Sequence, residues 1–235
     1  MIKGIIFDLD NTLYSYDLCN EAAMVHVLDY AAKAGIEKEQ FLSAFAQGKQ
    51  AVKECLGSNC AATHNRLLYF QKTLEILNRN PLCEAMDFYN QYWDHFLENM
   101  KLFDGAIDFL SQLKEKGIQM AICTDLTSHI QYRKIRKLGL DSYIHILVTS
   151  EEVGVEKPDS KMFLTALQKM ELKPEECTFI GDDLKKDIIG ASNVSIEPIL
   201  LSQNPDGAYQ CVRSFRELFD AFDFNNQLWN WGKIR

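Results

Sequence analysis

The chain has 235 residues, which is enough for one large domain or two modest ones. Hydrophobic residues make up 47% and charged residues 25%, a composition typical of a folded globular protein, so disorder is not expected. The formal net charge of −8 argues against nucleic acid or an anionic membrane as the main partner. No apolar run approaches the roughly 18 residues that a membrane span needs.

The cysteines indicate the redox environment. Seven of them are scattered along the chain, without a C-x-x-C pair and without histidines at metal-ligand spacing. An odd, unpatterned set favours reduced thiols over disulfides or zinc sites. We therefore expect a cytoplasmic protein.

The first predicted element is a short buried strand at residues 5–7, which ends at the polar Asp8. The character of the chain changes over residues 16–100, where apolar side chains recur at three- and four-residue spacing. Leu67, Phe70 and Leu74 are an example of this spacing. We expect four helices here, at residues 20–34, 38–55, 62–78 and 83–99. The stretch therefore reads as a helical unit without strands.

After Gly105 predicted helices alternate with predicted strands. Helices are expected at residues 106–116, 127–138, 160–170 and 184–191, and strands at residues 118–123, 145–148, 177–180 and 196–201. A further helix is expected after Ser214, which forms a capping-box signature with Glu217. This alternation implies a parallel sheet covered by helices on both faces. We predict one α/β domain from residues 1–15 and 101–235, with an all-α domain inserted at residues 16–100.

Polar clusters follow the predicted strands of the α/β domain. They are Asp8 and Asp10 after the first strand, Thr124 and Asp125 after the second, Lys157 beyond the third, and Asp182, Asp183 and Asp187 after the fourth. Ligands of parallel α/β sheets bind beyond the carboxyl ends of the strands, so all four clusters are expected at one edge. Each cluster alone could be a helix cap or a turn. Their common edge favours a catalytic site.

The two aspartates after the first strand suit covalent catalysis on phosphorus. Asp8 comes directly off a rigid strand, and a carboxylate there can attack phosphorus to form an aspartyl-phosphate. Asp10 lies two residues further on, where it could protonate the leaving alkoxide and then deprotonate the hydrolytic water. We therefore expect Asp8 and Asp10 to be catalytic.

The remaining clusters suit a metal ion and a phosphoryl group. Several carboxylates and a backbone carbonyl are ligands for a hard cation, above all Mg²⁺. The expected ligands are Asp8, the carbonyl of Asp10, and Asp182, with Asp183 and Asp187 orienting them. Lys157 is expected to stabilise the phosphoryl charge and to restrain Asp8. Substrate phosphate is expected to bind at Thr124, Asp125 and Lys157, through the Thr124 hydroxyl, nearby backbone N–H groups and the ammonium.

With these motifs the chain resembles the haloacid dehalogenase-like hydrolase superfamily over nearly its whole length. The matching motifs are Phe7-Asp-Leu-Asp-Asn-Thr12, Ile122-Cys-Thr124, Glu156-Lys-Pro158 with Phe163, and Gly181-Asp182-Asp183 with Asp187. The resemblance implies a Rossmann-like parallel sheet with a helical cap inserted after the first motif. Because Asp10 is present, it implies an Mg²⁺-dependent phosphatase and not a dehalogenase. One departure is Asp125, where many members carry Asn or Gly, since it adds negative charge near the phosphate site.

The expected function is hydrolysis of a small phosphate monoester through an aspartyl-phosphate. Residues 148–157 resemble the branch of small-metabolite and nucleotide phosphatases, which makes a nucleoside monophosphate one candidate substrate. A phosphomutase of the same superfamily and a phospho-aspartate receiver without turnover are the alternatives. The expected partner is a small phosphorylated metabolite, with no nucleic acid or membrane, and the oligomeric state, monomer or homodimer, stays open.

Overall fold

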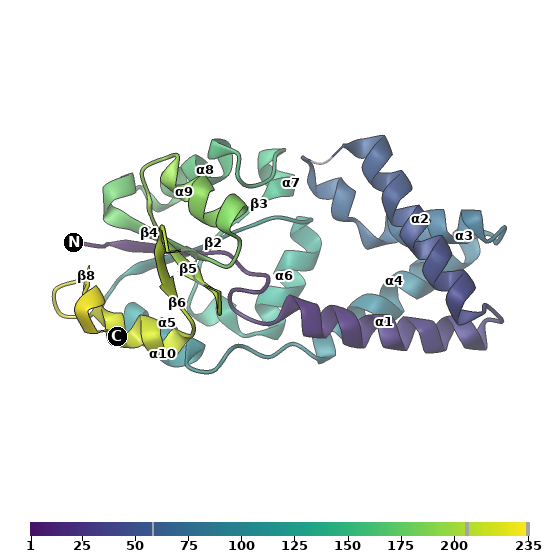
Figure 1. Cartoon of the computed structure of the whole chain (residues 1–235), viewed down its shortest axis with the longest axis horizontal. Coiled ribbons are helices and arrows are strands. Elements are labelled where there is room, and N and C mark those ends of the chain that lie inside the picture. The colour runs from purple at the N-terminus through teal and green to yellow at the C-terminus, as the bar shows by residue number, and fades with distance from the viewer. Residues whose placement is uncertain (58, 205–206, 234–235) are drawn as a thin grey trace. The chain divides into compact units, whose positions relative to one another are not determined.

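The protein is described by a computed structural model that covers residues 1–57, 59–204 and 207–233 (Figure 1). The chain divides into two compact units. Met1–Ser15 and Lys101–Arg235 form an α/β unit, and Tyr16–Met100 form a helical unit. In the described parts of the chain, no helix has both the length and the apolar character needed to cross a membrane.

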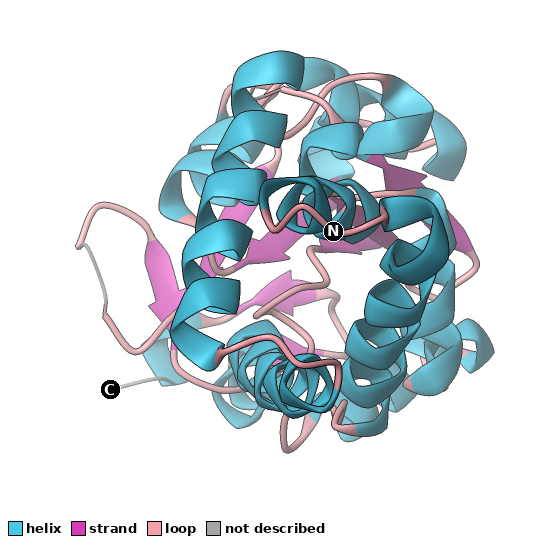
Figure 2. Ribbon diagram, turned by 90° about the vertical axis from the view of Figure 1, so that its right-hand side faces the viewer, coloured by secondary structure: helices cyan, strands magenta, loops and turns pink. Residues whose placement is uncertain are grey.

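The α/β unit is built on a six-stranded parallel sheet with the order β3-β2-β1-β4-β5-β6, drawn in magenta in Figure 2. The strands are β1 (Gly4–Phe7), β2 (Gln119–Thr124), β3 (Ile146–Thr149), β4 (Cys177–Gly181), β5 (Glu197–Leu201) and β6 (Gln210–Val212). The first strand of the chain is thus central, paired with β2 on one side and β4 on the other. The predicted α/β fold is confirmed.

Helices pack on both faces of this sheet. They are α5 (Ala106–Glu115), α6 (Ser128–Lys137), α7 (Ser150–Val153), α8 (Ser160–Met170), α9 (Gly190–Ser192) and α10 (Phe215–Ala221), with single turns η2 (Leu140–Ser142), η3 (Pro174–Glu176), η4 (Leu184–Ile189) and η5 (Trp231–Lys233). Successive residues of a strand point to opposite faces. Ile6 packs in the core with Phe163 of α8, whereas Phe7 meets Phe109 of α5, with ring centroids 6.5 Å apart. Figure 1 shows α8 and α9 on one side of the sheet and α5 and α10 on the other.

The helical unit contains α1 (Tyr16–Lys33), α2 (Lys38–Leu56), η1 (Ala61–His64), α3 (Arg66–Ile76) and α4 (Pro81–Glu98). Its core is aromatic: Phe70 stacks on Phe88 and packs at a tilt against Phe45. The predicted helix at residues 62–78 is divided in two. Asn65 accepts a hydrogen bond from Leu67 N and so caps α3, which separates α3 from η1.

Other differences from the expected elements have local causes. β6 and the antiparallel pair β7 (Phe222–Asp223) and β8 (Leu228–Trp229) were not predicted, because two- or three-residue strands carry no alternation pattern. The segment expected to be a helix at residues 184–191 is the π-helical turn η4, followed by α9. Ser214 does cap α10, accepting from Glu217 N.

The two ends of the α/β unit that flank the helical unit along the chain are joined to each other. Tyr14 and Leu102 form an antiparallel bridge, and Phe103 N donates to Leu13 O at 3.0 Å. The chain therefore leaves the α/β unit after Ser15 and re-enters it at Lys101 through neighbouring backbone segments.

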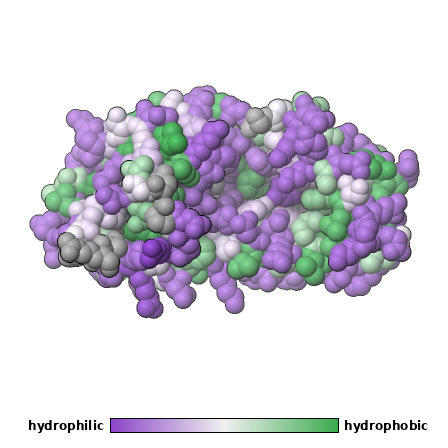
Figure 3. All heavy atoms as spheres, in the orientation of Figure 1, coloured by the Kyte–Doolittle hydropathy of each residue, from purple (hydrophilic) through white to green (hydrophobic). Residues whose placement is uncertain are grey.

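The surface seen in Figure 3 is mainly hydrophilic, with apolar side chains scattered over it. Single exposed apolar residues of this kind are normal in soluble domains.

Candidate active site

The site starts at Asp8, the residue after β1. Its backbone N donates to Ile180 O at 2.9 Å, which continues the pairing between β1 and β4 by one step. The Asp8 side chain is 8% exposed. Asp8 is therefore fixed by the sheet, while its side chain points beyond the carboxyl edge.

The turn after Asp8 brings Thr12 back to it. Asn11 adopts a left-handed conformation with φ 62°, which Asn tolerates better than most residues. Thr12 Oγ1 then lies 3.2 Å from Asp182 Oδ1 and 3.4 Å from Asp8 Oδ2. The hydroxyl of this first motif thus connects the end of β1 with the end of β4.

Lys157 holds two of the predicted acidic residues. Its Nζ lies 2.5 Å from Asp8 Oδ1 and 2.6 Å from Asp187 Oδ1, and the side chain is 3% exposed. Burial alone would lower the pKa of Lys157, but the carboxylates of Asp187 and Asp8 outweigh it and raise that pKa well above its usual value. The residue is therefore a stable ammonium group beside Asp8.

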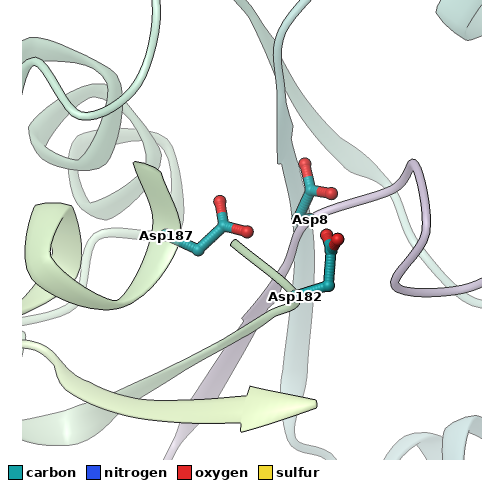
Figure 4. A group of neighbouring side chains, drawn as sticks. All are labelled: Asp8, Asp182 and Asp187. Atoms are coloured by element: carbon teal, nitrogen blue, oxygen red, sulfur yellow. The ribbon is translucent and has the colours of Figure 1, made fainter. Parts of the chain in front are cut away.

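Asp8, Asp182 and Asp187 form a cluster that could hold a metal ion (Figure 4). Each offers one carboxylate oxygen, and these three oxygens lie within 4.8 Å of one another. Burial and the charge of Asp187 raise the pKa of Asp182 to about 7. Such a concentration of carboxylates needs positive charge, and its all-oxygen donor set fits a hard divalent cation such as Mg²⁺.

This cluster differs in one member from the expected ligands. Asp187 is 1% exposed and lies among the clustered carboxylates, although it was expected only to orient them. The side chain of Asp10 points to other partners, and its expected contribution through the backbone carbonyl stays a prediction. Asp183 is exposed and caps η4, accepting from Lys185 N and Lys186 N at 2.8 Å. Its own N donates to Asp187 Oδ2 at 3.1 Å, and its expected role in orienting the metal ligands stays a prediction.

Thr124 and Asp125 lie at the end of β2, as expected. Thr124 is buried, and its hydroxyl accepts from Gln131 Nε2 at 2.7 Å. The Asp125 carboxylate accepts from Lys157 N at 3.0 Å and from Lys186 Nζ at 2.7 Å. The negative charge that departs from the family pattern is therefore paired with Lys186.

Asp10 has partners that the sequence did not suggest. Lys134 Nζ of α6 lies 2.8 Å from its Oδ1 and 2.9 Å from its Oδ2, and Tyr14 OH donates to Oδ1 at 2.5 Å. Gln131 and Lys134 are fully buried, on the face of α6 that also carries Ile130 and Ile135. Two polar residues on an otherwise apolar helix face are the signal that could have revealed them.

A site of this kind at the carboxyl edge of a parallel sheet defines a class of α/β enzymes. Within that class, the chain belongs to the haloacid dehalogenase-like hydrolases, because the sequence profile of that family matches residues 2–194. The predicted family and the prediction of an enzyme are confirmed.

Similar proteins support this placement. The chain is 38% identical over 222 residues to a ribulose-1,5-bisphosphate 5-phosphatase of Halopiger xanaduensis, covering 92% of each protein. It is 31% identical to a glyceraldehyde 3-phosphate phosphatase of Methanopyrus kandleri, covering 89% of this chain and 87% of that protein. The crystal structure of a 2-haloacid dehalogenase from Pseudomonas syringae shares the fold, with a TM-score of 0.75 and 20% identity over 93% of this chain and 96% of that chain.

Proposed function

We propose that the protein is a Mg²⁺-dependent phosphatase that hydrolyses a small phosphorylated sugar through an aspartyl-phosphate on Asp8. The observation that carries the proposal is the buried Asp8 carboxylate, which lies 2.5 Å from the Lys157 ammonium and is clustered with Asp182 and Asp187 at the end of the sheet. Buried charges are costly unless they are paired or bind a metal. Buried, closely spaced charges that cost free energy in this way are expected at catalytic sites.

The first half-reaction transfers the phosphoryl group to Asp8. A carboxylate oxygen of Asp8 attacks phosphorus, and the bond from phosphorus to the ester oxygen breaks. The leaving oxygen takes its proton from Asp10 and departs as an alcohol. Lys157 keeps Asp8 oriented and balances negative charge during the transfer, while Thr124 binds a phosphoryl oxygen.

The second half-reaction releases phosphate. Water attacks phosphorus, Asp10 accepts its proton, and the bond between phosphorus and Asp8 breaks to restore the carboxylate. Asp8, Asp182 and Asp187 would hold the Mg²⁺ ion, which when bound supplies positive charge to the phosphoryl oxygens. The water acceptor distinguishes this scheme from a phosphomutase, and the two sequence relatives from Halopiger xanaduensis and Methanopyrus kandleri are phosphatases.

The proposed substrate class rests on those relatives. Ribulose 1,5-bisphosphate and glyceraldehyde 3-phosphate are both small phosphorylated sugars. A nucleoside monophosphate as substrate and a cytoplasmic location remain predictions. A substrate panel should therefore contain sugar phosphates, sugar bisphosphates and nucleoside monophosphates.

The test is phosphate release across this panel with and without Mg²⁺, together with Asp8→Asn. We expect Mg²⁺-dependent release that is greatest with a sugar phosphate and is lost in Asp8→Asn. Asp159→Asn is the matched control, because Asp159 only caps α8 through a contact with Lys161 N that Asn can also make. Full activity of Asp8→Asn, or no release from any ester by the folded protein, contradicts the proposal.

A further inference from the structure

The interaction of α6 with Asp10 is not explained by the proposed mechanism. Lys134 is 0% exposed, and its Nζ contacts both oxygens of the Asp10 carboxylate, at 2.8 and 2.9 Å. Tyr14 OH donates to the same carboxylate, and the Tyr14 ring centroid lies 5.9 Å from the Lys134 ammonium. The side chain of Asp10 is thus held at both of its carboxylate oxygens.

Gln131 connects the same helix to the second motif. Its Nε2 lies 2.7 Å from Thr124 Oγ1, 2.9 Å from Asp125 O and 3.5 Å from Asp10 Oδ2. Gln131 and Lys134 are three residues apart and share one face of α6. One helix face therefore fixes both the proposed acid/base carboxylate and the hydroxyl proposed to bind phosphate.

These two polar side chains do not improve packing. Gln131 Oε1 is buried and has no hydrogen-bond partner in the described structure, which costs roughly 1–3 kcal/mol. Lys134 is fully buried and the side chain of Asp10 is 21% exposed, and an ion pair taken largely out of water is often no more stabilising than apolar residues of similar volume. Residues that break the local rule of an apolar helix face without a gain in stability are expected at functional sites.

We propose that Lys134 is a positioning residue that holds Asp10 in line with the leaving oxygen, and that Tyr14 assists it. This inference rests on the proposed phosphatase function. Transfer of a proton by a well-placed acid contributes about 10²- to 10⁴-fold to a rate, and a misplacement of about 1 Å can cost about 10²-fold. Loss of Lys134 should therefore impair protonation of the leaving group.

The experiment compares kcat/KM for two esters in Lys134→Met. An alkyl ester such as a sugar phosphate needs its leaving oxygen protonated, whereas 2,4-dinitrophenyl phosphate does not. Since kcat/KM reports the steps up to transfer to Asp8, we expect a loss of roughly 10- to 100-fold for the sugar phosphate and little change for the aryl ester. Lys169→Met is the matched control, because it removes an exposed pair with Glu152 elsewhere in the α/β unit.

Asp10→Asn provides the second comparison. If Lys134 acts through Asp10, Lys134→Met should add almost no further loss of kcat/KM when Asp10 is already Asn. Tyr14→Phe removes only the hydroxyl and is the variant to use if Lys134→Met does not fold. It should lower kcat/KM for the sugar phosphate more than for the aryl ester, by a smaller factor than Lys134→Met.

Three outcomes overturn the inference. They are an equal loss for both esters, no loss for either, and losses that multiply in the double variant. These outcomes are distinct from failure of the proposed function, which would show as activity retained in Asp8→Asn or as no phosphate release by the wild type.

Discussion

Three lysines form ion pairs with four acidic residues of the site. Lys157 contacts Asp8 and Asp187, Lys134 contacts Asp10, and Lys186 contacts Asp125 at 2.7 Å. Asp182 has no lysine within ion-pair distance among the described residues, and its pKa is raised to about 7 by burial and by Asp187. Of the clustered carboxylates, Asp182 thus has the greatest need for a metal ion.

The raised pKa of Asp182 makes the metal-free protein less stable as the pH increases. The folded state keeps a proton on Asp182 up to about pH 7, whereas the unfolded chain releases it near the ordinary value of 3.8. Between these values the folded state binds more protons, so the free energy of unfolding falls as pH rises. Asp182→Asn cannot lose a proton there, and we expect its stability relative to the wild type to grow across this window.

Urea denaturation in a chelator, at about pH 5 and about pH 8, measures this difference. Added Mg²⁺ should stabilise the wild type at the higher pH much more than Asp182→Asn, since a ligand that binds only the folded state raises its stability. Asp159→Asn controls for loss of one surface charge. Parallel pH dependence in the wild type and Asp182→Asn would refute the prediction.

At the scale of residues, the motifs were predictable and their partners were not. Four of the motif residues follow predicted strands, namely Asp8, Thr124, Lys157 and Asp182. Because the carboxyl ends of parallel strands lie at one edge of a sheet, their proximity was predictable. Lys134 and Lys186 lie in helices, and their contacts with Asp10 and Asp125 span 124 and 61 residues of sequence. Such pairs depend on how α6 and η4 pack, which no local pattern encodes.

Among the elements, the turn from β4 to η4 requires glycine at its start. A Cβ on Gly181 would lie 2.5 Å from the Cβ and Cγ atoms of Asp187, closer than atoms can pack. A Cβ on Gly190 would lie 2.5 Å from Phe163 Cζ in the core and 3.2 Å from Pro158 Cα, and no carboxylate is among these neighbours. Gly181 thus leaves room for the Asp187 side chain, and Gly190 leaves room for Phe163 of α8.

We expect Gly181→Ala and Gly190→Ala each to destabilise the protein by about 1–3 kcal/mol through overpacking. Only Gly181→Ala should also weaken Mg²⁺ binding, because it displaces Asp187, which lies 2.6 Å from Lys157. Isothermal titration with Mg²⁺ and urea denaturation of both variants separate the two effects. Equal Mg²⁺ affinities in the two variants would show that Asp187 need not stay where it lies.

The segment after Gly181 differs from the helix that its sequence pattern predicted. Apolar periodicity predicted a helix at residues 184–191, and a helical segment is present. Its first part is a π-helical turn, in which the N–H groups of Lys185 and Lys186 both donate to Asp183 Oδ1. A wide turn of this kind is frequent at functional sites. Long periodic helices were predicted well, because their apolar faces extend over several turns.

On the scale of the molecule, the bridge between Tyr14 and Leu102 makes the helical unit a closed insertion. Its ends are already adjacent in the backbone of the α/β unit, so a short connection can replace it at a small cost in loop entropy. We expect a variant with a Gly-Ser linker in place of residues 16–100 to keep the six-stranded sheet. Hydrogen exchange of the β1 and β2 amides tests this, and rapid exchange of both would show that the sheet needs the helical unit.

The central place of β1 also orders events during synthesis. β1 is made before the other strands of the sheet, but it pairs with residues 119–122 and 177–180, which are made much later. The helical unit is contiguous and is built of helices, whose backbone contacts are local and form fastest. It can fold before the strands that pair with β1 have been synthesised, as domains do during translation. A chain stopped before Gln119 would then carry a finished helical unit and a β1 strand without either of its neighbours.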